Sequence, residues 1–189
     1  MDITSKVEID RAVATLTLSF NTDPFARWLY DRADQYLLHA SRIFGLFAED
    51  SFGAKTAQRT EDGFGIALWL PAGIHGDDEP LGAVLAESMT EEKLAEAGAV
   101  FEQTEKYRPI EPHWYLQLIG VEARQQNRGY GAALLRHALH RCDRDHLPAY
   151  LWSSNPLNTS LYRRHGFETM GTIQEGSAPP IIPMLRPAR

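Results

Sequence analysis

Apolar residues along this chain recur first at helical spacing. Ile9, Val13, Leu16 and Phe20 lie three or four positions apart, which predicts a helix ending near Asn21. The segment from Leu16 to Phe20 also alternates between apolar and polar residues and would fit a short strand. A start signal for the next helix follows at once in Thr22-Asp23-Pro24, which has an acid at the cap and proline at the first helical position.

The remainder of the first half combines helices with one predicted hairpin. A longer helix is expected from Arg32 to Phe47, and a loop rich in glycine, proline and acids from Pro71 to Pro80. The other predicted elements are two strands, Ser51 to Gln58 and Phe64 to Leu70, then two helices, Leu81 to Met89 and Glu91 to Tyr107, the second capped by Thr90.

The second half alternates more regularly between strands and helices. Its predicted elements are a strand from His113 to Val121, a helix from Gly129 to Asp143, a strand from Pro148 to Ser153, a short helix from Asn155 to Arg164, and strands from Phe167 to Ile173 and Ile181 to Leu185. No internal repeat interrupts this order. The pattern predicts an α/β or α+β fold around one mixed sheet.

Composition narrows the classes of function. A chain of 189 residues with 43% hydrophobic content is expected to bury one core and form a single domain. The net charge of −6 argues against a nucleic-acid partner and favours a cationic one. There is no bilayer-spanning apolar run, and the start of the chain does not resemble a signal peptide, so we expect a cytoplasmic protein with no membrane partner.

Neither the single cysteine nor the histidines indicate a catalytic or metal-binding role. Cys142 falls on the apolar face of its helix, which predicts a buried, inert thiol. His137, His140 and His146 fall on the polar face near the helix end, where solvated histidines are common. We therefore expect no metal site.

The most distinctive segment is the glycine turn Gln126-Asn127-Arg128-Gly129-Tyr130-Gly131, which lies between a predicted strand and a predicted helix. Amide groups at a helix start have no intrahelical partners and bind anions readily, and glycine permits positive φ and close approach. Neither the P-loop lysine nor the third glycine of a dinucleotide fingerprint is present, since Leu134 stands in the latter position. The turn therefore predicts a phosphate cradle of another type.

Three motifs in order connect this cradle with a known family. They are Leu118-Ile119-Gly120-Val121, then Gln126-x-x-Gly129-x-Gly131, then Asn155 followed by Leu161-Tyr162 and Gly166-Phe167. Together they resemble the GNAT acyl-CoA N-acyltransferase superfamily over about Trp114 to Phe167. The segments Asp23-Pro24, Ala67 to Pro71 and Ser154 to Asn158 further resemble its puromycin N-acetyltransferase-like branch. Ala123 and Asn127 depart from the pattern, where proline and glycine are frequent.

The resemblance implies a mostly antiparallel sheet of about six or seven strands, splayed between its two central strands to admit acetyl-CoA as cosubstrate. The implied pyrophosphate contacts are Gln126, Asn127, Arg128, Gly129, Tyr130, Gly131 and Ala132; the implied contacts to the pantetheine arm are Ile119, Gly120, Val121, Asn155 and Asn158. An amide near Ile119 would stabilise the oxyanion. Tyr162 would protonate the departing thiolate, because tyrosine is protonated at neutral pH.

The acceptor is less well defined by the sequence. Four aromatic residues are candidates for flat apolar walls of its pocket and are equally good core residues: Phe25, Trp28, Tyr30 and Trp114. We expect a cytoplasmic enzyme, monomer or homodimer, that acetylates the primary amine of a small molecule by direct attack. A protein or peptide acceptor and a non-catalytic acyl-CoA-binding module remain alternatives. No motif identifies the general base, for which Glu111, His113, Tyr115, Glu122 and an ordered water are all candidates.

Overall fold

The computed structural model describes all residues from 1 to 189 and contains one seven-stranded sheet. Its order is β1-β2-β3-β4-β5-β7-β6, and every neighbouring pair is antiparallel except β4 and β5. The strands are β1 (Ile3–Thr4), β2 (Gln58–Thr60), β3 (Gly65–Leu70), β4 (Trp114–Val121), β5 (Ala149–Ser153), β6 (Glu168–Thr169) and β7 (Ile182–Arg186). The expected mixed, mostly antiparallel α/β fold is confirmed.

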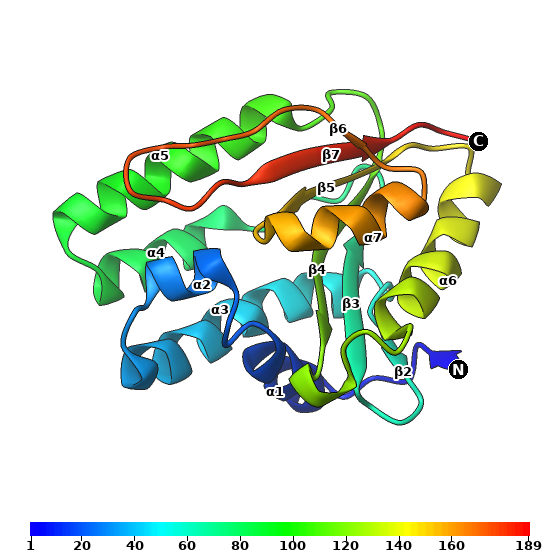
Figure 1. Ribbon diagram of the computed structural model, residues 1–189, viewed down its shortest axis with the longest axis horizontal. Helices are drawn as coiled ribbons and strands as arrows, with labels where there is room; N and C mark the ends of the chain where they lie inside the picture. Colours follow the sequence, from blue (N-terminus) through cyan, green and yellow to red (C-terminus); the bar gives the residue numbers. More distant parts are fainter.

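Seven α-helices and two short 3₁₀ helices surround the sheet (Figure 1). They are α1 (Ile9–Ser19), α2 (Pro24–Leu29), α3 (Ala33–Gly53), α4 (Asp78–Ser88), α5 (Glu91–Tyr107), η1 (Ala123–Gln125), α6 (Tyr130–Arg144), η2 (Pro156–Asn158) and α7 (Thr159–Arg164). None of these helices is long and apolar enough to cross a bilayer. The ambiguous segment from Leu16 to Phe20 belongs to α1, except that Phe20 is its C-cap.

The helices form two layers. On one face, Leu134 and Leu135 of α6 pack with Trp69 and Trp114 in the larger core cluster. On the other, α1, α3 and α4 bury residues such as Leu16 and Phe44 against Ile66 and Leu68 of β3. Cys142 lies within the first cluster, where burial raises the pKa of its thiol to about 12, as expected for an inert side chain.

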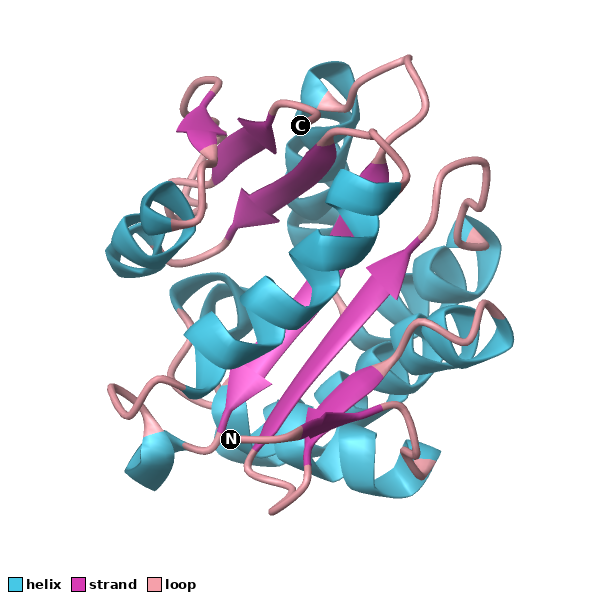
Figure 2. Ribbon diagram, turned by 90° about the vertical axis from the view of Figure 1, so that its right-hand side faces the viewer, coloured by secondary structure: helices cyan, strands magenta, loops and turns pink.

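The sheet opens between its two central strands. β4 and β5 pair only where Trp114 meets Ala149 and Tyr115 meets Tyr150, after which they diverge (Figure 2). The edge of β4 from Leu116 to Val121 therefore has no strand partner on that side. A register shift against β3, in which Leu68 opposes Leu118 but the next residue opposes Leu116, places Gln117 in a bulge that bends β4 here.

Two predicted strands had the wrong bounds, and one strand was not predicted. Ser51 to Gly53 continue α3 because Ser51 is buried there and its hydroxyl donates to Oε1 of Gln117, so the predicted strand begins only at Gln58. The strand expected from Phe167 to Ile173 keeps two residues, since Phe167 is drawn into the core and Ile173 makes an isolated bridge with Ile181. The two-residue β1 was too short to predict.

Candidate functional site

The glycine turn between β4 and α6 forms the predicted cradle. Gly129 has φ +89° and Asn127 has φ +60°, so the asparagine adopts the left-handed conformation that glycine often occupies. None of the backbone N–H groups from Asn127 to Ala132 donates to a protein acceptor, and no side chain caps α6. Six consecutive free amides at the positive end of a helix form an anion site.

Two glycines of the motifs serve helix packing. A Cβ at Gly120 would lie 2.9 Å from Cβ of Ser19, so this glycine lets α1 approach β4. A Cβ at Gly131 would lie 3.1 Å from Cδ2 of Leu161, so this glycine lets α6 approach α7. The absence of a side chain at Gly120 is thus explained by the packing of α1, and the backbone of Gly120 also lines the polar groove described next.

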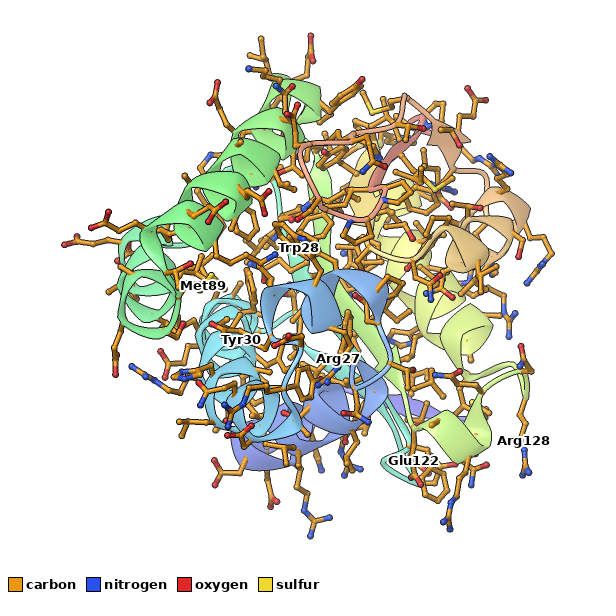
Figure 3. All side chains as sticks on the ribbon, turned by 60° about the vertical axis from the view of Figure 1, so that its left-hand side comes forward. Arg27, Trp28, Tyr30, Met89, Glu122 and Arg128 are labelled. Carbon is orange, nitrogen blue, oxygen red and sulfur yellow. The ribbon has the colours of Figure 1, made fainter.

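A polar groove runs from the cradle along the free edge of β4. All but one of the residues predicted to contact the cosubstrate line this groove. They are Ile119, Gly120, Val121, Gln126, Asn127, Gly129, Tyr130, Gly131, Ala132, Asn155 and Asn158. Arg128 is the exception, because its exposed side chain points away from the groove (Figure 3). The Tyr130 hydroxyl donates to Oδ2 of Asp62 over 2.7 Å and fastens the start of α6 to the β2–β3 turn.

A second, apolar cavity lies between β4, α2, α3 and α4. The empty space in it and at its mouth, open solvent included, amounts to about 970 Å³, and 20 of its 25 lining residues are hydrophobic. The groove and the cavity share five lining residues, which are Phe20, Asp23, Ile119, Asn158 and Tyr162. The two spaces therefore meet, and the only carboxylate and the predicted acid stand where they join.

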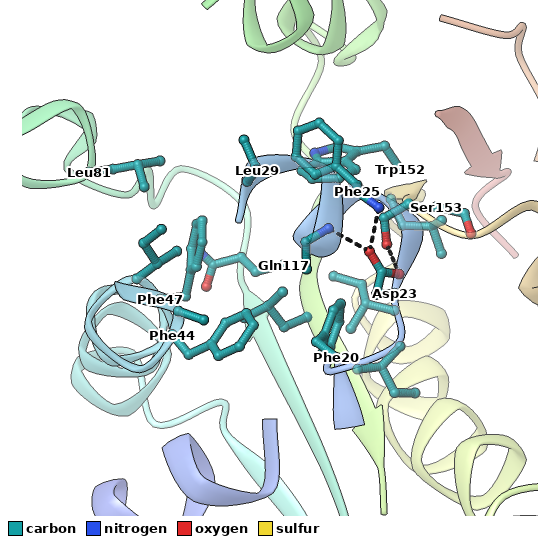
Figure 4. Close-up of a pocket in the computed structure, with 18 of the residues that line it drawn as sticks. Phe20, Asp23, Phe25, Leu29, Phe44, Phe47, Leu81, Gln117, Trp152 and Ser153 are labelled. Carbon is teal, nitrogen blue, oxygen red and sulfur yellow. Dashed lines mark hydrogen bonds between the residues drawn. The ribbon is translucent and has the colours of Figure 1, made fainter. Parts of the chain in front are cut away.

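Hydrogen bonds hold both carboxylate oxygens of Asp23 in place at this junction (Figure 4). Oδ1 accepts hydrogen bonds of 3.0 Å from the amides of Phe25 and Ala26, as an N-cap does, and Oδ2 accepts one of 2.6 Å from the Ser154 hydroxyl. Burial raises the pKa of Asp23 above its ordinary value, and the three hydrogen bonds only partly oppose this effect. The sequence explained Asp23 fully as a helix cap and so missed its position in the site.

Tyr162 lies on α7 at the same junction and is 5% exposed. Burial raises the pKa of its hydroxyl, and the nearby charge of Asp23 raises it further. The phenol is therefore held in its protonated form at neutral pH. The Tyr162 ring packs edge-on against the ring of Phe167, with centroids 6.0 Å apart. This contact with a core residue fixes the orientation of the Tyr162 side chain. A buried proton donor thus stands beside a buried carboxylate.

The aromatic walls differ in part from the prediction. Of the four candidates, Phe25 and Tyr30 line the cavity. Trp114 does not, because it lies in the core beneath α6 and its indole N–H donates to Oδ2 of Asp145. Trp28 also stays outside: it stacks on Phe25 at 5.4 Å, and the ammonium of Lys93 lies 3.4 Å from its ring centroid. Phe20 and Phe44, which were not among the candidates, are two of the further aromatic residues in the lining.

The four side chains considered as general base differ in whether they line the cavity. Tyr115 lines the cavity, but burial raises the pKa of its hydroxyl to about 12. His113 is buried outside the cavity, with Nδ1 2.8 Å from the carbonyl oxygen of Glu111. Glu111 is exposed, and Glu122 lies at the surface away from the cavity (Figure 3). Asp23 is better placed than any of them.

No group of three or more histidine, cysteine or acidic side chains is arranged to hold a metal ion. Asp23 is the only charged residue among those that line the cavity. The chemistry available at this site is therefore the binding of an anion by amides, the burial of an apolar body, and proton transfer by one carboxylate and one phenol.

Comparison with known proteins agrees with this geometry. Residues 23–167 match the model of the acetyltransferase (GNAT) family. An uncharacterized N-acetyltransferase of Schizosaccharomyces pombe is 26% identical over 183 residues, covering 83% of this chain and 69% of that protein. A crystal structure described as histone acetyltransferase HPA2 and related acetyltransferase, from Corynebacterium glutamicum, has a TM-score of 0.69 at 24% identity, covering 99% and 96% of the two chains.

A more distant fold likeness extends over the whole chain. Arylalkylamine N-acetyltransferase 2 from Aedes aegypti superimposes with a TM-score of 0.64 at 11% identity, covering 100% of this chain and 99% of that one. At such identities the two structural likenesses establish the fold alone.

Proposed function

Since this chain belongs to the acetyltransferase (GNAT) family, we propose that it transfers the acetyl group of acetyl-CoA to the primary amine of a small molecule. One observation carries the proposal. A polar groove that ends in free helix amides joins an apolar cavity, and Asp23 and Tyr162 stand at the join.

The groove fits acetyl-CoA in its chemistry. The pyrophosphate is an anion, and the free backbone N–H groups from Asn127 to Ala132 can donate hydrogen bonds to it. The positive end of the α6 dipole also favours an anion there. The unpaired edge of β4 suits the amide-rich pantetheine arm, which can add to a sheet edge as a peptide does. Asn155 uses Oδ1 to cap η2 and keeps its amide N–H groups free for the same arm. Arg128 is left out of this assignment because it lies outside the groove.

The reaction removes two protons from the substrate nitrogen and delivers one to sulfur. In our proposal Asp23 takes the first proton from the substrate ammonium, and the free amine then attacks the thioester. As the C–N bond of the new amide forms and the C–S bond breaks, Tyr162 gives its proton to the sulfur of CoA, and the second proton lost by nitrogen restores the phenol. The raised pKa of Asp23 makes it a stronger base than an exposed aspartate, and the protonated phenol is the state an acid needs. A backbone N–H near Ile119 remains our candidate for the oxyanion.

The cavity favours a small acceptor over a peptide. It is bounded by α2, α3 and α4 and lined mainly by apolar side chains, whereas an extended peptide brings many backbone groups that need hydrogen-bond partners. We retain the puromycin N-acetyltransferase-like branch as a proposal. It is supported by the Asp23-Pro24 and Ser154-Asn155 segments, which the structure joins through a hydrogen bond.

A thiol-release assay tests the proposed function. Acetyl-CoA is mixed with the protein and a panel of primary amines, and each amine is paired with its N,N-dimethyl analogue, which has no N–H to replace. We expect thiol release with primary amines and none with their dimethyl partners. Calorimetric binding of CoA together with silence across the panel would overturn catalysis and leave a binding module.

A further inference from the structure

We propose that the acceptor is a monoamine whose single ammonium is carried on a neutral apolar body. This inference rests on the proposed acetyl transfer and adds the class of acceptor. It comes from three properties of the cavity: rigid aromatic walls, polar lining atoms that are already engaged, and one carboxylate at one end.

Contacts among the lining rings themselves hold the aromatic walls in place. The ring of Phe25 meets those of Phe101 and Trp152 edge-on at 5.9 and 5.8 Å. Phe20 and Phe44 pack against each other, with ring centroids 5.3 Å apart and planes tilted by 49°. Rings held in this way form a preformed apolar wall, which binds apolar surface without first having to order its own side chains.

The polar groups that line the cavity are mostly committed to protein partners. The hydroxyl of Tyr36 donates to the carbonyl of Thr17 over 2.7 Å, and that of Tyr30 lies 2.7 Å from the Ser88 hydroxyl. Gln117 accepts from Ser51 through Oε1, at 3.0 Å. An acceptor molecule that carried polar groups into the cavity would therefore lose their water without gaining equivalent bonds.

The carboxylates further limit the charge of the acceptor. Asp23 is the only charged residue of the lining and stands at the end shared with the groove. Asp50 lies behind Gln117, whose Nε2 is 3.5 Å from its Oδ2, and does not line the cavity. A second ammonium on the substrate would be buried without an acid to pair with it. The site should therefore select one ammonium next to Asp23 and a neutral apolar remainder.

Leu81 marks the far end of the cavity. It lies on α4, half-buried, and Figure 4 shows it across the cavity from Asp23. A carboxylate in its place would supply the missing partner for a second ammonium. Leu37 on α3 is 57% exposed and is not part of the lining, so the same substitution there changes the charge of the protein without changing the cavity.

The test compares kcat/KM for 2-phenylethylamine, for the diamine cadaverine and for a tripeptide with a free N-terminus. In the wild-type protein we expect 2-phenylethylamine to exceed each of the others by about 100-fold, because burying an unpaired ammonium or polar backbone is costly. Equal or better rates with cadaverine or the tripeptide would overturn the inference and leave acetyl transfer standing. Absence of thiol release with all three would overturn both.

Two variants add an independent readout. We expect Leu81→Glu to lower the ratio of 2-phenylethylamine to cadaverine at least about 10-fold, by pairing one buried charge. Leu37→Glu should leave that ratio unchanged. An unchanged ratio in a folded Leu81→Glu protein would contradict the assigned cavity, and should that variant not fold, the wild-type ratios decide alone.

Discussion

The Ser154 hydroxyl donates a 2.6 Å hydrogen bond to Oδ2 of Asp23, a residue 131 positions away in the chain. This bond ties the end of β5 to the start of α2. Because α2 amides hold the other oxygen, the carboxylate has one fixed orientation at the junction of groove and cavity. A base that is held in this way needs no reorganisation when substrate arrives.

Replacing Asp23 with asparagine should separate catalysis from folding. Asparagine is an equally good N-cap, so α2 should still form, but the side chain can no longer take a proton. We expect kcat to fall about 10²- to 10⁴-fold, the usual contribution of a general base. Thiol release by Asp23→Asn protein with a native circular dichroism spectrum measures this. Wild-type turnover in that variant would remove Asp23 from its role.

The same variant has a predicted effect on stability. Burial raises the pKa of Asp23 above its ordinary value of 3.8, so the folded state binds this proton more tightly than the unfolded state does. As pH rises from 3.8 through the folded-state pKa, this group lowers the free energy of unfolding. Asp23→Asn should therefore be at least as stable as wild type at pH 7, and its relative stability should increase across that pH range. Urea denaturation at several pH values checks the sign.

Ser154 is predicted to tune the base. Its hydrogen bond lowers the pKa of Asp23, so Ser154→Ala should raise that pKa. The acid limb of the kcat/KM profile should then move to higher pH, because the carboxylate is ionised over a narrower range. Ser160→Ala, on α7 in the groove lining, is the control and should leave the limb in place. A shift to lower pH would contradict the arrangement.

Tyr162→Phe should reduce turnover more than binding. The variant keeps the ring that packs against Phe167 and loses only the hydroxyl proton. We expect kcat to fall about 10²-fold or more while the Kd for CoA changes less than about threefold. Rapid thiol release and calorimetry give the two numbers. An equal loss in both would mean that the hydroxyl serves binding alone.

Gly129→Ala should weaken the cradle. Nothing lies within 4 Å of the added Cβ, so the effect comes from the φ of +89°, which an L side chain adopts at a penalty of about 1–2 kcal/mol. If binding CoA requires that conformation, its Kd should rise about 5- to 30-fold. Gly82→Ala in α4, with equally open space and ordinary φ, should leave the Kd unchanged. Unchanged binding in Gly129→Ala would show that the turn is not the anion site.

Local features of the fold and site were predictable from the sequence. The cradle was predictable because glycines between an apolar run and a helical pattern indicate a tight strand-to-helix turn, and the Asp23 cap because Asp-Pro sets a helix start locally. Trp114 was a candidate for both the pocket wall and the core, and it lies in the core. The face of a strand residue depends on register, and the bulge at Gln117 shifts it by an amount that apolar spacing does not reveal.

The second role of Asp23 was beyond the reach of local pattern. It depends on Ser154, on Tyr162 and on a cavity built from α2, α3, α4 and β4, all brought together by tertiary contacts. Capping already accounted for the residue, and no spacing rule connects positions 23 and 154. The aromatic rings of Phe20 and Phe44 were missed for the same reason.

A crystal structure with a bisubstrate analogue, in which CoA is joined through an acetyl bridge to 2-phenylethylamine, tests the central claim most directly. We predict pyrophosphate density on the amides of residues 127 to 132, the linked nitrogen beside Asp23 and Tyr162, and the phenyl ring inside the apolar cavity, in contact with its aromatic lining. A phenyl ring directed into solvent, with the apolar cavity left free, would contradict this account.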